Sequence, residues 1–236
     1  WNFDYVIVRR SDRSPVAASF FTTSLIKDDM FVRDSVSRAV EMRRREDPYF
    51  LTSVACMMGS QLSEGNHLWI DREGPWRSAL RRMLEVATDI HDRSTASMLM
   101  LRDLPADDPD MDAFMLDAGF VKLPVLDSHV VDVNFHDDET MLARLGKRAR
   151  SHVRQIMTST PGFTRTLHGA GTGTNAGVAK VDANLLKHLH GLYRNVASRK
   201  LRINVFELPE ALLPSLLENP AWEVVTLTLK PEAGGP

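Results

Sequence analysis

Residues 76–101 read WRSALRRMLEVATDIHDRSTASMLML, and this stretch decides the fold class. Its first part carries apolar side chains at helical spacing, namely Leu80, Met83, Leu84, Ala87 and Ile90. That spacing predicts an amphipathic helix. The run at 97–101 is short, apolar and bounded by polar residues, which predicts a buried strand directly after the helix. A helix that alternates with strands indicates an α/β layer.

The segments on either side extend this α/β pattern. Downstream, Asp108-Pro109 opens a short helix that ends at Gly119, where a left-handed C-cap is expected. Another strand is expected at 126–133. Upstream we expect a charged helix at 35–46 and strands at 3–10, 16–23, 51–58 and 67–71, the first two forming a hairpin.

The second half of the chain predicts more helix. Asp137 is expected to cap a helix of about five turns, with its apolar residues near one face. Residues 159–177 are expected to form a break with a flexible Gly/Thr-rich connector. Because no partner strand follows the strand expected at 224–229, we expect the chain to be a fragment of a longer protein. The other elements expected here are helices at 185–197 and 209–217.

Composition excludes several classes of protein. The 236 residues hold 29 Lys and Arg against 31 Asp and Glu, so the formal net charge of −2 excludes a protein that coats nucleic acid generally. No run of about 18 apolar residues exists, so no membrane span is expected. The single cysteine, Cys56, excludes an internal disulfide framework and a Cys-rich zinc site, and it favours a cytoplasmic setting.

The charge is unevenly distributed along the chain. Residues 103–139 contain eleven acidic residues and one basic residue, whereas residues 141–181 contain seven basic residues and no acidic one. Arg144, Arg148 and Arg154 are expected on one side of the helix. That side is either a solvated helix face or a cationic site for a phosphate-bearing ligand, such as a nucleotide-type cofactor or RNA. No aromatic residue lies in 141–160 to stack on single-stranded bases, which disfavours RNA.

Several stretches together resemble a known family. The pattern that ends in Phe114-Met115-Leu116-Asp117-Ala118-Gly119-Phe120 is similar to the second half of an acyltransferase of the GNAT superfamily. The resemblance to a bacterial family of FemAB-like, GNAT-type proteins of peptidoglycan biosynthesis or recognition covers nearly the whole chain. The stretches that carry it lie at 5–8, 15–17, 20–22, 27–30, 47–53, 58–60, 64–68, 101–103, 127–130, 148–154 and 204–209.

The resemblance implies two GNAT-like domains in tandem. The implied fold is α/β, with a GNAT-like mixed sheet flanked by helices in residues 1–135, which lacks its opening helices. A basic linker helix follows at 136–160, and a partial second GNAT-like domain covers 161–236.

The resemblance also implies a reaction. An acyl group would pass from acyl-CoA, such as acetyl-CoA, to the amine of a small molecule or peptide. In the Fem branch the donor is an aminoacyl-tRNA and the acceptor is a peptidoglycan precursor, so tRNA is an alternative partner. A third alternative is a non-catalytic module that recognises a ligand.

The donor site implied by the family is a turn of the form Arg/Gln-x-x-Gly-x-Gly/Ala, in which backbone N–H groups at a helix N-terminus hold a pyrophosphate. The matching place here departs from that form, since Pro75 and Arg77 replace the small residues and Pro75 lacks an N–H. The residues expected to contact the donor are Arg72, Gly74, Trp76 and Arg77.

The other candidate residues each have a structural alternative. Asp127 and His129 share one face of a strand, so the carboxylate can orient the imidazole as a general base, or both are simply exposed polar residues. On the acceptor side we expect the charged group Lys27-Asp28-Asp29, whose structural alternative is a turn. We also expect Arg102 there, whose structural alternative is a surface ion pair with Asp103. The residues concerned are Lys27, Asp28, Asp29, Arg102 and Asn204, with Arg148 and Arg154 for an anionic ligand.

No metal site is expected from the sequence. His188 and His190 are two residues apart on a predicted helix, so they do not share a face.

Overall fold

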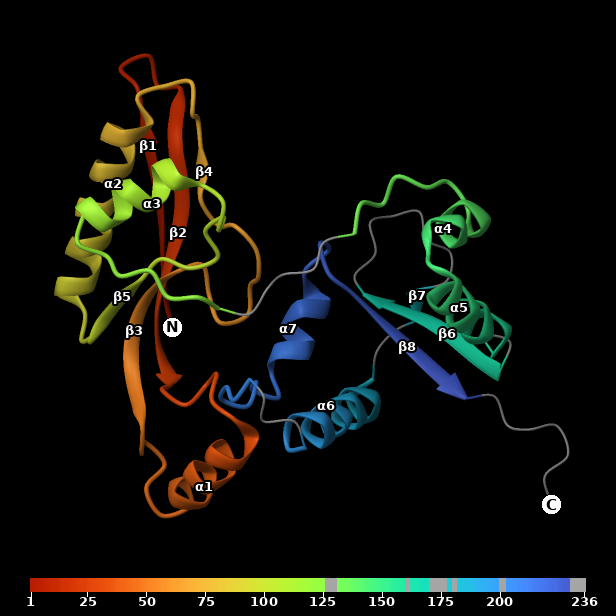
Figure 1. Ribbon diagram of the computed structural model, residues 1–236. Helices are drawn as coiled ribbons and strands as arrows, with labels where there is room; N and C mark the ends of the chain where they lie inside the picture. The colour runs from red at the N-terminus through yellow and green to blue at the C-terminus, as the bar shows by residue number, and fades with distance from the viewer. Residues whose placement is uncertain (126–130, 160–161, 170–177, 180–181, 200–202, 230–236) are drawn as a thin grey trace, which may run out of the picture. The chain divides into compact units, whose positions relative to one another are not determined.

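A computed structural model describes residues 1–125, 131–159, 162–169, 178–179, 182–199 and 203–229 (Figure 1). The chain divides into two compact units. Unit 1 comprises Trp1–Ser128 together with Lys200–Phe206, and unit 2 comprises His129–Arg199 together with Glu207–Pro236. Both units combine helices with a sheet, so the predicted α/β class is confirmed.

Unit 1 is built on a mixed sheet with the strand order β1-β2-β3-β5. The strands are β1 (Asn2–Arg9), β2 (Pro15–Lys27), β3 (Thr52–Met58) and β5 (Met98–Met100), with the two-residue β4 (Trp69–Ile70) also paired to β2. The first three strands are antiparallel and begin with the predicted hairpin. β3 and β5 are parallel, and α2 (Trp76–Arg93) makes the crossover between them.

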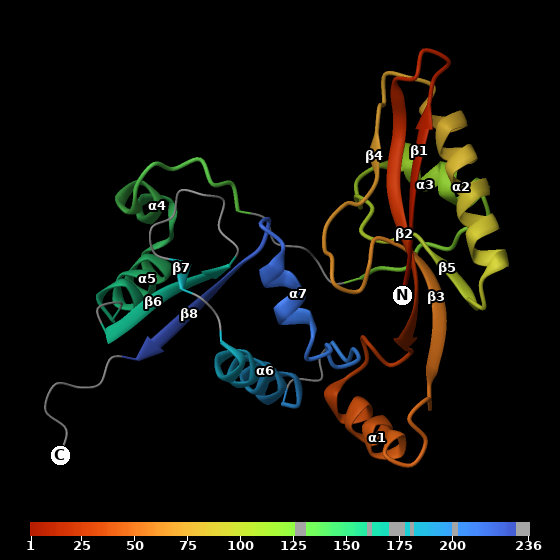
Figure 2. The same ribbon diagram turned by 180° about the vertical axis from the view of Figure 1, so that it is seen from behind.

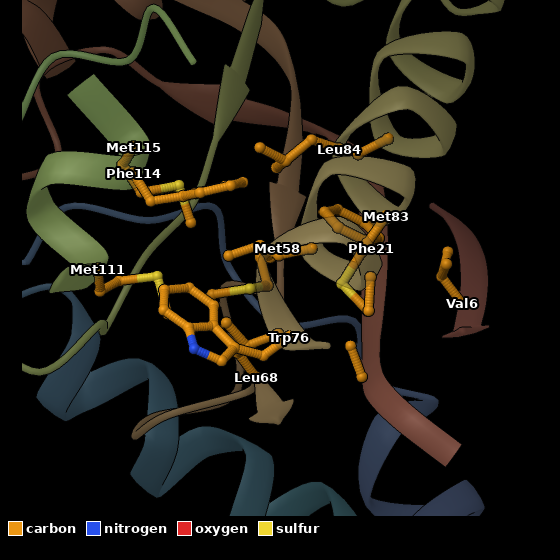
Figure 3. Close-up of a cluster of buried hydrophobic side chains, with 14 of the residues drawn as sticks. Val6, Phe21, Met58, Leu68, Trp76, Met83, Leu84, Met111, Phe114 and Met115 are labelled. Carbon is orange, nitrogen blue, oxygen red and sulfur yellow. The ribbon is translucent and has the colours of Figure 1, made fainter. Parts of the chain in front are cut away.

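The core of unit 1 lies between the sheet and helices α2 and α3 (Pro109–Asp117), which cover the same face in both views (Figures 1 and 2). The apolar stripe predicted for residues 76–93 faces inward, because Leu80, Met83 and Ala87 are all buried. Figure 3 shows Trp76 and Met83 among the side chains that fill this space. The amphipathic helix therefore holds the sheet by burial of apolar surface.

The ends of α3 follow from its sequence. The Asp108 side chain accepts a hydrogen bond from the Met111 N–H, and Pro109 takes the first helical position. At the other end Gly119 has φ +89°, which confirms the predicted left-handed cap. The Gly119 and Phe120 N–H groups donate to the Leu116 and Met115 carbonyls, and Phe120 packs against the core.

Unit 2 contains a three-stranded sheet with the order β7-β6-β8. Its strands are β6 (Phe163–Gly169), β7 (Val178–Ala179) and β8 (Glu223–Leu229). Its helices are α4 (Asp138–Arg144), α5 (Lys147–Ser159), α6 (Ala183–Ala197) and α7 (Leu212–Glu218). The remaining helix of the described chain, α1 (Asp34–Arg44), belongs to unit 1.

Two predictions for the second half are wrong. The single helix of about five turns is two helices, because Leu145 is extended and the Arg150 guanidinium donates to the Leu142, Ala143 and Leu145 carbonyls at the end of α4. The predicted break at 159–177 contains β6, which pairs antiparallel with β8. The strand near the end of the chain, β8, therefore has a partner, although that partner, β6, precedes β8 in the sequence.

One predicted strand of unit 1 is only partly described. Val131–Val133 lie outside any strand, whereas residues 126–130 lie outside the described residues. No helix in the described ranges is long and apolar enough to cross a membrane.

We expect Met83→Ala to destabilise the protein by about 2–5 kcal/mol, because a side chain that is 1 % exposed would leave a cavity under α2. Urea unfolding followed by tryptophan fluorescence measures the change. Met42→Ala, on the exposed face of α1, is the matched control and should change the free energy of unfolding by less than about 0.5 kcal/mol. Equal effects of the two substitutions would contradict this account of the core.

Candidate functional site

The turn before α2 gathers the residues expected at the acyl donor. The guanidinium groups of Arg72 and Arg77 lie 4.2 and 4.3 Å from the centroid of the Trp76 ring. Such cation–π contacts hold both side chains in place. Each cation also has a carboxylate partner, since Arg72 pairs with Asp108 and Arg77 lies 2.8 Å from Asp110. Both carboxylates come from the start of α3.

The rest of this turn is also occupied. A Cβ atom on Gly74 would clash with the guanidinium of Arg10, which forms an ion pair of 2.6 Å with Asp71. Pro75 stands at the N-cap of α2 and provides no N–H. With its cations neutralised by the protein's own carboxylates, the turn does not fit a pyrophosphate as it stands.

Arg102 links the carboxyl ends of the two parallel strands. It follows β5 and donates to the Ser60 carbonyl, just beyond β3, at 2.7 Å. It also forms the predicted ion pair with Asp103, at 3.0 Å. In α/β sheets ligands bind at the carboxyl ends of parallel strands, and Arg102 lies at that edge.

Gly59, immediately before Ser60, is packed against His67. It has φ +77°, and a Cβ atom there would clash with the imidazole ring, so only glycine fits. The Nε2 atom of His67 is buried and has no hydrogen-bond partner among the described residues. The sequence had given His67 no role.

A second site lies at the end of β2, where the structure brings distant residues together. Lys27, Asp29 and Asn204 were each expected on the acceptor side, and they meet Glu41 and Arg44 from α1. We call these five residues the charged cluster. Four of them are buried, with exposed fractions of 8 % for Lys27, 4 % for Asp29, 7 % for Arg44 and 2 % for Asn204. Glu41 is partly exposed.

Arg44 is the cation at the centre of the charged cluster. Its guanidinium lies 2.6 Å from Asp29 Oδ1 and 2.7 Å from Glu41 Oε1. It also donates to the Phe50 and Leu51 carbonyls, in the turn that leads into β3. The buried charge is therefore paired and hydrogen-bonded on several sides, which a buried guanidinium requires.

Lys27 and Asn204 complete the charged cluster. The Lys27 ammonium lies 2.8 Å from Glu41 Oε1 and 3.2 Å from Asn204 Oδ1, with the Phe206 ring 5.2 Å away. The Asn204 amide donates to Asp29 Oδ2 and Glu41 Oε1, both at 2.8 Å. Asp28, the other residue predicted here, points elsewhere: it is exposed and accepts a hydrogen bond from Ser53 at 3.0 Å.

The electrostatics of the charged cluster keep its acids ionised. Burial alone would raise the pKa of Asp29, but hydrogen bonds from Arg44 and Asn204 hold that pKa below its usual value. Burial opposes ionisation of Glu41 as well, yet hydrogen bonds from Lys27, Asn204 and Arg44 lower its pKa. Carboxylates of lowered pKa are weak bases at neutral pH, so this cluster is suited to hydrogen bonding rather than to proton transfer.

The remaining predicted residues are not brought to either site. Asp127 and His129 lie outside the described residues. Arg148 is exposed on α5, and Arg154 lies 3.6 Å from Glu139. The expectation that Arg144 shares their helix is wrong, because Arg144 belongs to α4.

Sequence reasoning missed Glu41, Arg44 and Phe206. The first two lie in a helix where seven of eleven residues are polar or charged, so nothing in the spacing distinguishes them from solvated residues. A usable signal was the stretch 204–209, which the resemblance singles out and which contains Phe206.

Comparison of the chain with protein-family models, curated proteins and solved structures finds no match.

We expect the stability of the protein to be constant near neutral pH and to fall below about pH 5. Because the pKa values of Asp29 and Glu41 are lowered in the folded state, their stabilisation is present above the unfolded pKa and is lost as the pH drops through the folded pKa. Thermal unfolding from pH 3 to 8 measures this dependence.

Asp29→Asn should lower the free energy of unfolding at pH 7 by about 3 kcal/mol, because it leaves Arg44 without its buried counter-charge. The same variant should flatten the fall in acid. Glu46→Gln, which removes an exposed ion pair with Arg43, is the control and should leave the profile unchanged. An unaltered acid profile in Asp29→Asn would contradict the assignment.

Proposed function

We propose that the chain is part of an N-acyltransferase of the GNAT type, which transfers an acyl group from acyl-CoA to the amine of a small molecule or peptide. The observation that carries this proposal is the connection β3-α2-β5-α3, with its parallel pair of strands and its close at Gly119-Phe120. The resemblance implies an order of strand, turn, helix, strand and short helix, in which the strand directly before the turn corresponds to β4. Such an argument supports a reaction class and leaves the substrate open.

The polar groups at the carboxyl ends of β3 and β5 support the same proposal. Arg102 fixes the two strand ends relative to each other through the Ser60 carbonyl. This is where an α/β sheet offers room for a ligand. In the proposed reaction the amine must lose a proton, and His129 oriented by Asp127 is the proposed base.

The turn before α2 has a different role in this proposal. Its arginines already hold Asp108 and Asp110, so we propose that the pyrophosphate of the donor is not bound by Arg72 and Arg77. The turn then serves to join α2 to α3 by ion pairs across Trp76.

A ligand-recognition module without catalysis is the second candidate function. The neutralised turn favours it, because a domain that has lost the cationic character of its donor site has no means of holding acyl-CoA there. Binding of acetyl-CoA separates the two candidates.

Calorimetric titration of the whole chain with acetyl-CoA is expected to show binding. Arg72→Ala combined with Arg77→Ala should change the Kd less than about twofold, because both guanidinium groups are already paired within the protein. Arg82→Ala, which replaces an exposed arginine of α2, is the matched control.

Two results would contradict this account. Absence of binding by the unaltered chain would remove the acyl-CoA proposal and favour the recognition module. A tenfold loss of affinity in the double variant, with Arg82→Ala unchanged, would place the donor at this turn after all.

His129→Ala should lower the rate of acetyl transfer to a primary amine by about 10²–10⁴-fold, since a positioned base contributes that much. The measurement is kcat/KM for a panel of amines, together with its pH profile. His136→Ala, an exposed histidine in unit 2, should leave both unchanged. Full activity of His129→Ala would exclude this residue as the base.

A further inference from the structure

The charged cluster is arranged around one primary carboxamide, the side chain of Asn204. Its Nδ2 atom donates one hydrogen bond to Asp29 and one to Glu41, and its Oδ1 atom accepts from Lys27. The charges fix the orientation of the amide. Turned over, its oxygen would face two carboxylates and its NH2 group would face an ammonium.

Unit 1 therefore offers a primary carboxamide two acceptors and one donor. Arg44 holds the two carboxylates in position, because its guanidinium lies 2.6 Å from Asp29 and 2.7 Å from Glu41. The complementarity excludes related groups. A tertiary amide lacks both N–H donors, and a carboxylate ligand would be repelled by Asp29 and Glu41.

We propose that Lys27, Asp29 and Glu41 form a binding site for primary carboxamides, and that Asn204 is the ligand the chain itself supplies. Asn204 and Asp29 are 175 residues apart in the sequence, so their hydrogen bond is a tertiary contact and not part of a local turn. The inference does not depend on the proposed acyltransferase activity, because it uses only contacts made within unit 1.

Two further contacts hold the internal ligand in the site. The Asn204 N–H donates to the Met30 carbonyl at 2.9 Å, which pins the backbone. Two residues later, the Phe206 ring lies 5.2 Å from the Lys27 ammonium, so it contributes a cation–π contact to the same charge. The site thus recognises a carboxamide together with an aromatic ring that follows it.

The Asn204 carboxamide is expected to stabilise the folded state. Removing the carboxamide leaves Lys27, which is 8 % exposed, and Asp29, which is 4 % exposed, each without one hydrogen-bond partner. Buried polar groups without partners are destabilising. A small primary amide added in solution should then enter the vacated space and restore the bonds.

The test is chemical rescue of Asn204→Ala in the full chain. We expect the substitution to lower the thermal unfolding midpoint by about 5 °C. Formamide, which matches the deleted CONH2 group, should raise the midpoint of the variant in a saturable way, whereas N,N-dimethylformamide and formate should not. The same additions to the unaltered protein give the non-specific effect of each compound, which is subtracted.

Asn204→Leu is the matched control, because it removes the same hydrogen bonds but fills the space, so formamide should not rescue it. Asn204→Asp should be less stable than Asn204→Ala at pH 7, since it adds a third carboxylate beside Asp29 and Glu41. If Asn204→Ala is unfolded in buffer, the comparison is made on the folded fraction recovered during refolding with each compound.

Three results would overturn the proposal. The first is an Asn204→Ala variant as stable as the unaltered protein. The second is equal rescue by formamide and N,N-dimethylformamide. The third is an Asn204→Asp variant as stable as Asn204→Ala at pH 7.

Discussion

The buried ion pair between Arg44 and Asp29 is the interaction on which the arrangement of α1, the end of β2 and the turn before β3 depends. Arg44 joins α1 to the end of β2 through Asp29, and to the turn before β3 through the Phe50 and Leu51 carbonyls. A guanidinium that is 7 % exposed tolerates burial only with such a set of partners. The positions of Glu41, Lys27 and finally Asn204 follow from where this charge is held.

The two candidate sites of unit 1 use charge in the same way. At the turn before α2, Arg72 and Arg77 meet carboxylates at the start of α3, and in the charged cluster each cation meets a carboxylate from α1 or from the turn after β2. Both sites are close to neutral, so neither attracts a ligand by charge alone. In the charged cluster, directed hydrogen bonds fix the orientation of the bound side chain by its pattern of donors and acceptors.

The sequence predicted those elements whose signals are local. The hairpin, the stripe of α2 and the cap at Gly119 all depend on residues within one element. The prediction from sequence failed where residues from another element determine the local structure. The end of α4 depends on Arg150, and β6 depends on pairing with β8 some 60 residues later. For the site, Lys27 and Asp29 were predicted as one charged group and Asn204 as a separate residue, but only the fold shows that they form one cluster with Arg44.

The assignment of residues 200–206 to unit 1 has a consequence for how the protein is made. The first segment of unit 2, His129–Arg199, is synthesised entirely before the piece that completes unit 1. At about 5–20 residues per second, the 160 residues from Arg44 to Asn204 take about 8–32 s to synthesise, and the cluster at the end of β2 lacks its last member for that time. During that interval Lys27 and Asp29 can be satisfied by water, and the closing of unit 1 becomes a late event in synthesis.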